Sequence, residues 1–92
     1  MTSTKEPILF DRGRIEYSDV YSDDKYEYRH VILPHETTKE RENIERLRRM
    51  DRTLSEGEWR MIGLQMSLGW THFGCFGAEP HVLLFRRTPR DV

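Results

Sequence analysis

Apolar and polar residues alternate in two stretches near the start of the chain, residues 15–21 and 26–33. In the first stretch Ile15, Tyr17 and Tyr21 fall on one face, and the second stretch repeats the pattern up to Pro34. A period of two is typical of a half-buried β-strand. The segment 22–24, Ser-Asp-Asp, supplies residues that favour a turn. We therefore expect two strands joined by a turn.

The pattern changes to a helical period after Pro34. In the charged stretch 36–52 the long apolar side chains are Ile44, Leu47 and Met50, spaced i, i+3, i+6. This spacing predicts a helix with a thin apolar stripe and a solvated charged face.

A second helix is predicted to begin at residue 55. Ser55 and Glu58 have the spacing of a capping box, in which each side chain bonds to the other residue's backbone N–H. An apolar stripe follows, and Gly69 is expected to end the helix. The stripe residues are Trp59, Ile62, Gly63 and Met66.

Two further strands are predicted over residues 70–76 and 81–87, with residues 77–80, Gly-Ala-Glu-Pro, as the loop of a hairpin. Counting outward from this loop gives the expected cross-strand pairs. They are Phe76 with His81, Cys75 with Val82, His72 with Phe85 and Trp70 with Arg87.

The last of these pairs suggests an anion site. It places an indole N–H beside a guanidinium near Ser67, and Arg29 on a neighbouring strand adds a second forked cation. Arginine with hydroxyl and N–H donors is the chemistry that holds a phosphate group. The alternative from spacing alone is that these arginines pair with nearby acids and that Trp70 is a core residue.

Composition limits the remaining possibilities. A chain of 92 residues supports one domain, and a formal net charge of −1 argues against a general nucleic-acid binder. Residues 1–14 show no sustained period and are expected to be a flexible N-terminal extension. The longest apolar run, residues 82–85, is too short to span a membrane, and the single cysteine, Cys75, favours a reducing compartment.

Catalytic and metal chemistry find little support. The four histidines lie on the predicted strands or at a strand end, and neither zinc spacing nor a glycine-rich phosphate loop is present. Ser67 lacks an evident base and Cys75 lacks an evident activator. We expect no catalytic residue, no metal and no cofactor, although a small enzyme built around His72, Cys75 or Ser67 is the third alternative.

Two segments closely resemble signatures of the Cks family, the small non-catalytic subunits of cyclin-dependent kinases. They are residues 17–34, YSDVYSDDKYEYRHVILP, and residues 79–87, EPHVLLFRR. Residues 55–60 and 67–70 look like the family's second helix and the start of its third strand. The match covers residues 15–89 apart from the charged helix.

The resemblance implies an α+β fold, with a four-stranded antiparallel sheet and two helices on one side, in a single domain over residues 15–92. It implies a regulatory subunit that binds a cyclin-dependent kinase in nucleus and cytoplasm and recruits phosphothreonine-containing substrates in cell-cycle control. The matching positions for phosphate are Arg29, Ser67, Trp70 and Arg87. Those for the kinase are Tyr21, Cys75, Phe76 and Glu79.

Departures from the family pattern limit this transfer. Val20 stands where the family usually has a pocket lysine, and Gly74 and Cys75 replace bulkier apolar residues, while Phe76 replaces a histidine. The charged helix is longer than in most members. The alternative function is therefore a phosphopeptide-binding adaptor that does not bind a kinase.

The hinge before the last strand also departs from the family, in which two prolines favour exchange of that strand between two chains. Here only Pro80 remains, and Ala78 occupies the other position. We expect mainly a monomer, with a strand-exchanged dimer as its other state, and neither nucleic acid nor membrane as a partner.

Overall fold

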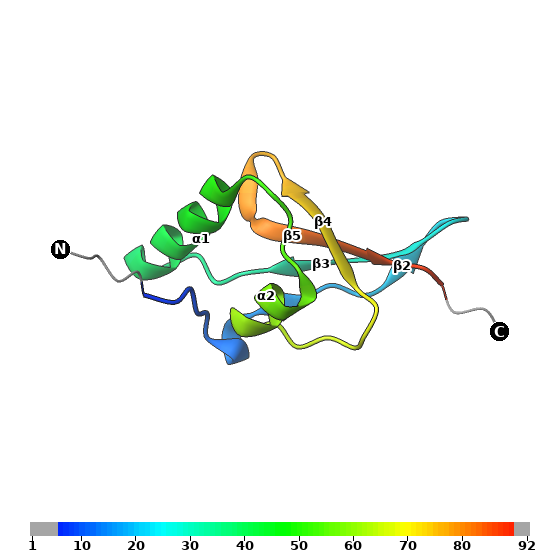
Figure 1. Cartoon of the computed structure of the whole chain (residues 1–92), viewed down its shortest axis with the longest axis horizontal. Coiled ribbons are helices and arrows are strands. Elements are labelled where there is room, and N and C mark those ends of the chain that lie inside the picture. Colours follow the sequence, from blue (N-terminus) through cyan, green and yellow to red (C-terminus); the bar gives the residue numbers. More distant parts are fainter. Residues whose placement is uncertain (1–5, 90–92) are drawn as a thin grey trace.

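The structure is a computed structural model that describes residues 6–89, except for the side chain of Phe76. Its antiparallel sheet has the strand order β1-β3-β5-β4, and β2 also pairs with β3 (Figure 1). The elements are η1 (Arg12–Arg14), β1 (Glu16–Tyr17), β2 (Tyr21–Ser22), β3 (Glu27–Ile32), α1 (Thr38–Met50), α2 (Glu56–Met61), β4 (Thr71–Phe76) and β5 (Glu79–Arg87). The α+β class with two helices is confirmed.

The sheet has five strands rather than four because the first expected strand is split. Tyr17 pairs with Val31, whereas Tyr21 pairs with Tyr28, so three residues face two across the gap. The Ser18 hydroxyl accepts the His30 N–H at 2.9 Å, and the Ser18 N–H donates to the His30 carbonyl at the same distance. One extra residue in one strand is a bulge, which bends the strand and interrupts its pairing.

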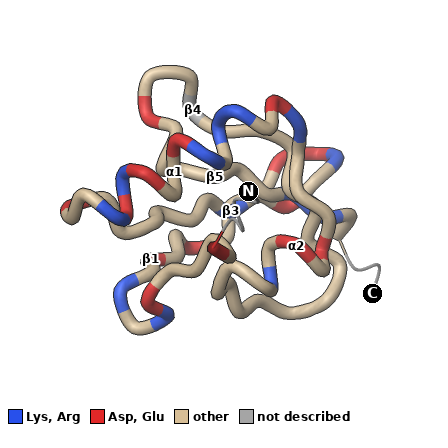
Figure 2. The backbone as a smooth tube through the Cα atoms, turned by 60° about the vertical axis from the view of Figure 1, so that its left-hand side comes forward, with Lys and Arg blue, Asp and Glu red and all other residues tan. Residues whose placement is uncertain are grey.

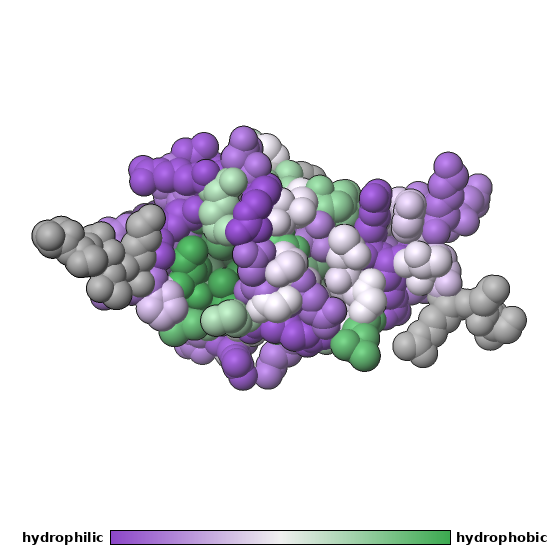
Figure 3. Space-filling view, in the orientation of Figure 1, coloured by the Kyte–Doolittle hydropathy of each residue, from purple (hydrophilic) through white to green (hydrophobic). Residues whose placement is uncertain are grey.

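The core lies between the helices and one face of the sheet. On that face Val31, Leu33 and Phe85 have no exposed surface, and the fully buried Trp59 of α2 meets Phe85 edge to face at 5.5 Å. The face of the molecule seen in Figure 3 is mostly hydrophilic, with hydrophobic residues gathered below α1.

The expectation of a flexible extension over residues 1–14 needs correction. Residues 1–5 lie outside the described part of the chain, but Phe10 is a core residue whose N–H donates to the Ile62 carbonyl at 3.0 Å. The Asn43 side chain also donates to the Leu9 carbonyl at 3.1 Å. Residues 9–10 are thus tied to both helical segments and belong to the domain. Sequence periodicity missed them because the segment is irregular.

α1 is shorter at both ends than the expected 36–52. Thr37 and Glu40 form a capping box at its start, and Asp51, with a φ of 54°, ends it. Ile44 is buried, and Leu47 and Met50 pack against the core. The predicted apolar stripe is therefore confirmed.

α2 begins where it was expected and ends much earlier. Ser55 and Glu58 form the predicted capping box, and hydrogen bonds from Arg52 and from the Ser55 backbone lower the pKa of Glu58 to about 2. The helix stops at Met61 instead of near Gly69, since Gly63 has a φ of 123° that turns the chain away.

Gly63→Ala should destabilise the protein. A side chain is strained at that φ, and a Cβ atom would lie 3.0 Å from the Phe10 carbonyl oxygen. We expect the free energy of unfolding to fall by about 1–3 kcal/mol. Urea denaturation checks this, and Gly57→Ala is the matched control because a Cβ there meets nothing within 4 Å. Equal effects of the two substitutions would contradict the argument.

The β4–β5 hairpin is tighter than predicted. Phe76 pairs with Glu79 rather than His81, which leaves Gly77 and Ala78 as a two-residue loop, and Cys75 pairs with Leu83 rather than Val82. Two register shifts cause the difference, one between His72 and Gly74 and one between Cys75 and Phe76. The His72–Phe85 pair is confirmed.

Ala78→Pro should raise the fraction of strand-exchanged dimer. Ala78 is the third of the four residues of the turn 76–79, where proline is disfavoured because it restricts the residue before it. The strain is relieved if the segment extends and β5 pairs with another chain. Light scattering after size exclusion measures the shift, with Ala78→Ser as the control. A dominant dimer of the unmodified chain at low micromolar concentration would contradict the hinge argument.

Candidate functional site

The candidate anion site lies at the end of the β4–β5 hairpin away from its turn. Arg29 comes from β3, Arg87 ends β5, and Trp70 directly precedes β4. Because Thr71 pairs with Arg86, continuing that register places Trp70 opposite Arg87, as the sequence predicted. Ser67 is in the loop between α2 and β4.

The four predicted residues meet around the indole ring of Trp70. The Arg87 guanidinium carbon lies 4.4 Å from the ring centroid, and that of Arg29 lies 5.6 Å from it. The Arg87 Nη1 group donates to the Ser67 hydroxyl at 3.2 Å. Cations over an indole face are attracted by its electrons, so the ring helps to hold both guanidinium groups beside it.

Trp70 also carries a polar atom with no partner. The residue is only 3% exposed, and among the described residues nothing accepts a hydrogen bond from its Nε1–H group. Leaving a buried donor unpaired costs about 1–3 kcal/mol. A ligand that supplied an acceptor oxygen would recover part of this cost. The alternative that Trp70 is a core residue also holds, since Trp70 belongs to the core cluster.

Sequence reasoning missed Glu27, which neutralises part of the site. Glu27 pairs directly with Arg87 across β3 and β5, and its carboxylate accepts from the Arg87 Nε group at 2.6 Å. The second cation is anchored differently, because Arg29 donates from Nε and Nη2 to the Ser18 carbonyl at 3.3 and 3.2 Å. Only the pairing of β3 with β5, which places Glu27 opposite Arg87, could have identified this residue. These contacts orient both guanidinium groups before any ligand binds.

Tyr17 is a second missed residue. The Arg29 guanidinium lies 5.6 Å from the Tyr17 ring centroid, and the Tyr17 hydroxyl accepts the Gln65 N–H at 2.8 Å. Tyr17 therefore links β1, Arg29 and the loop that carries Ser67. Val20, at the family's lysine position, is 42% exposed and supplies no charge.

A second surface is the face of the sheet opposite the core. Tyr21 is 51% exposed and stacks on Tyr28 at 5.8 Å, and Phe73, 37% exposed, meets Tyr28 edge to face at 6.1 Å. The Arg86 guanidinium lies over the rings of Tyr26 and Phe73 at 4.5 and 5.1 Å. Sequence reasoning named only Tyr21 here. The exposed aromatic rings suit a protein-binding surface, in which aromatic residues and arginine are enriched.

The other expected kinase positions do not share that face. Cys75 is exposed but lies opposite Leu83, and therefore on the side of the hairpin that faces α1. Glu79 is exposed at the start of β5, and the Phe76 side chain lies outside the described part of the structure. These three positions thus lie at the turn end of the hairpin, away from Tyr21, which pairs with Tyr28 beside Arg86 at the open end.

The described residues offer no candidate for a metal site or a membrane-spanning helix. Within residues 6–89 no group of three or more metal-ligating side chains lies together, and no helix there is long and apolar enough to cross a membrane. Basic and acidic residues are interspersed along most of the tube in Figure 2, although η1 carries only arginines and β1 only a glutamate.

Comparison with known proteins gives one consistent result. Residues 15–89 match the family model described as "Cyclin-dependent kinase regulatory subunit". A probable cyclin-dependent kinases regulatory subunit of Physarum polycephalum is 53% identical over 76 residues, 83% of this chain and 82% of that protein. The regulatory subunit 2 of Arabidopsis thaliana is 52% identical over 75 residues, 82% of each chain. The subunit 2 of Xenopus laevis is 47% identical over 78 residues, 84% of this chain and 90% of that protein.

Proposed function

This chain belongs to the family of cyclin-dependent kinase regulatory subunits, and from that membership we propose that it holds phosphothreonine-containing substrates beside a bound kinase. The phosphate site is formed by Arg29, Ser67, Trp70 and Arg87. The kinase binds the exposed aromatic face of the sheet and the turn end of the hairpin. The protein itself catalyses nothing and acts in nucleus and cytoplasm.

The observation that carries the phosphate site is the contact of two guanidinium groups with the ring of Trp70, whose Nε1–H group has no acceptor among the described residues. A phosphate dianion supplies the missing acceptors, and each charge-assisted hydrogen bond contributes roughly 1.5–3 kcal/mol. A neutral threonine hydroxyl supplies far less. Glu27 lowers the net positive charge of the site, which favours weak, reversible binding.

A phosphothreonine peptide with a following proline tests the proposal. It should bind to the full chain in isothermal titration calorimetry, and the same peptide without phosphate should not. The pairing of Arg87 with Glu27 should not prevent binding, because it uses Nε, and Nη2 and the second hydrogen of Nη1 are left to reach the ligand. Equal affinity for both peptides would overturn the phosphate site.

The second candidate function is a phosphopeptide-binding adaptor without a kinase partner. It is favoured by Gly74 and Cys75, which are small residues on the turn end of the hairpin. Purified cyclin-dependent kinase decides between the two candidates. Binding of the kinase by the full chain supports the first proposal, and binding of the phosphopeptide alone supports the adaptor.

A further inference from the structure

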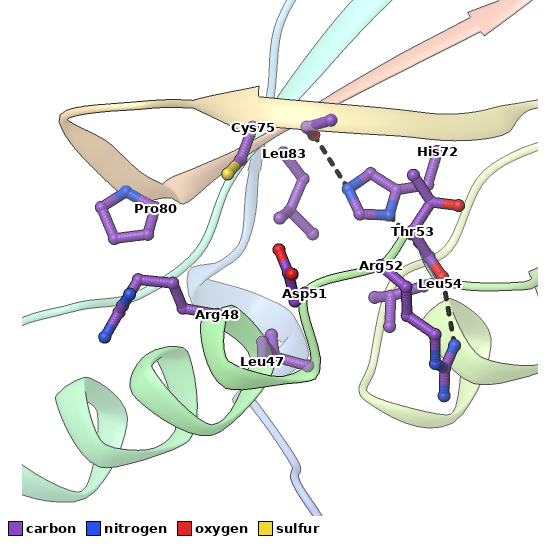
Figure 4. Close-up of a pocket in the computed structure, with 11 residues that line it drawn as sticks. Leu47, Arg48, Asp51, Arg52, Thr53, Leu54, His72, Cys75, Pro80 and Leu83 are labelled. Atoms are coloured by element: carbon purple, nitrogen blue, oxygen red, sulfur yellow. Dashed lines mark hydrogen bonds between the residues drawn. The ribbon is translucent and has the colours of Figure 1, made fainter.

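A cavity of about 310 Å³ lies between the end of α1 and the β4–β5 hairpin (Figure 4). Leu47, Leu54 and Leu83 give it an apolar lining. Leu54 and Leu83 are buried, whereas Cys75 is exposed, so solvent reaches the cavity beside Cys75. In Figure 4 the Cys75 sulfur points toward α1, next to Pro80.

The cavity is open because the β4 residue whose side chain faces it is small. Cys75 lies opposite Leu83 with a side chain too short to fill the space above Leu47, and Gly74 adds only backbone atoms to the lining. Folded proteins normally fill apolar spaces to near-crystalline density. An open apolar space of this size is therefore suited to a side chain from another molecule.

The chemistry of the walls favours a neutral apolar occupant. His72 uses both ring nitrogens, because Nδ1 accepts the Leu54 N–H at 2.8 Å and Nε2 lies 2.9 Å from the Gly74 carbonyl, to which it donates. Burial lowers the pKa of His72, which favours the neutral ring. The charged lining residues are Arg48, Asp51 and Arg52, and the two arginines are paired with Glu45 and Glu58.

We infer that this cavity receives an apolar side chain of the cyclin-dependent kinase, an inference that rests on the proposed function. The cavity is continuous with the proposed kinase surface, since Cys75 lies at its mouth and Pro80 of its lining follows the exposed Glu79. Because Cys75 faces α1 and not the aromatic face, a kinase that touches the thiol also meets the mouth of the cavity. The kinase therefore contacts both the aromatic face and the side of the hairpin that faces α1.

Filling the cavity from α1 tests the inference, because α1 lies outside the proposed kinase surface. Leu47→Phe should weaken binding of purified cyclin-dependent kinase by about tenfold or more, the effect of losing a buried anchor. The affinity for the phosphothreonine peptide should not change. Leu47→Met, which conserves the volume, is the matched control and should bind the kinase normally. Calorimetry measures both affinities.

Cys75→Leu fills the cavity from the opposite wall and decides the matter if Leu47→Phe does not fold. Cys75 is the only cysteine of this chain, so the mass of this chain after iodoacetamide treatment reports on it alone, and the bound kinase should slow its alkylation. A wild-type chain that binds no kinase would overturn the proposed function. If the wild type binds and both filled variants bind equally well, the proposed function stands and the cavity inference is wrong. Parallel loss of peptide binding would also overturn it.

Discussion

Arg87→Glu is expected to abolish binding of the phosphothreonine peptide. The guanidinium of Arg87 joins Trp70, Ser67 and Glu27, so the substitution removes the central cation and sets two carboxylates opposite each other. Losing the charge-assisted bonds and adding repulsion should reduce the affinity by at least about a hundredfold. Calorimetry with the phosphorylated peptide measures the loss.

Arg86→Glu is the matched control for this loss. Arg86 is the neighbouring residue and undergoes the same change of charge, but it lies over Tyr26 and Phe73 on the other face of the sheet. It should therefore leave peptide binding nearly intact. Circular dichroism confirms folding, and Arg87→Gln avoids the facing carboxylates if Arg87→Glu does not fold. Similar peptide affinities for Arg86→Glu and Arg87→Glu would show that only net charge matters.

Much of the fold is local in origin and could be predicted from the sequence. The Ser55–Glu58 capping box and the stripe Ile44, Leu47 and Met50 depend on residues within one or two turns of each other. The end of α2 could not be predicted, because the turn at Gly63 brings it close to the carbonyl of Phe10, which is distant in the sequence. Long-range contacts of this kind override local periodicity.

The candidate anion site could be predicted because the expected hairpin register was correct at the open end of the hairpin, where the site lies. The expected hairpin register was wrong near the turn, yet it was right for His72 and, by extension, for Trp70. The tighter turn and the shift at Gly74 move the register in one direction, and the shift between Cys75 and Phe76 moves it back by the same amount, so the errors cancel before the open end of the hairpin. Glu27 remained unseen because its role depends on the pairing of β3 with β5.

The kinase positions were harder to place. Residues 74–76 were treated as one surface, but the sides of a strand alternate, and the register shifts in β4 change which side each residue takes. Cys75 consequently faces α1. The aromatic face escaped notice because Tyr28 of β3 and Tyr26 just before it are far in the sequence from Phe73 of β4.

Tyr21→Asp should remove kinase binding and leave peptide binding intact. Tyr21 is half exposed, and it stacks on Tyr28 and tilts against His30, which makes it a rigid aromatic anchor at low entropic cost. Placing a carboxylate there should weaken kinase binding by more than about thirtyfold, as expected when an aromatic anchor worth about 2 kcal/mol is lost. Surface plasmon resonance with immobilised kinase measures the effect.

Tyr21→Phe is the control, since it keeps the ring and its stacking on Tyr28 and removes only the hydroxyl. It should bind the kinase within about threefold of the wild type, because an exposed hydroxyl contributes little once water replaces its partner. Arg87→Glu should conversely keep the kinase while losing the peptide, since Arg87 lies on the core side of the sheet and Tyr21 on the other. If either substitution removes both partners from a folded chain, the two sites are not separate.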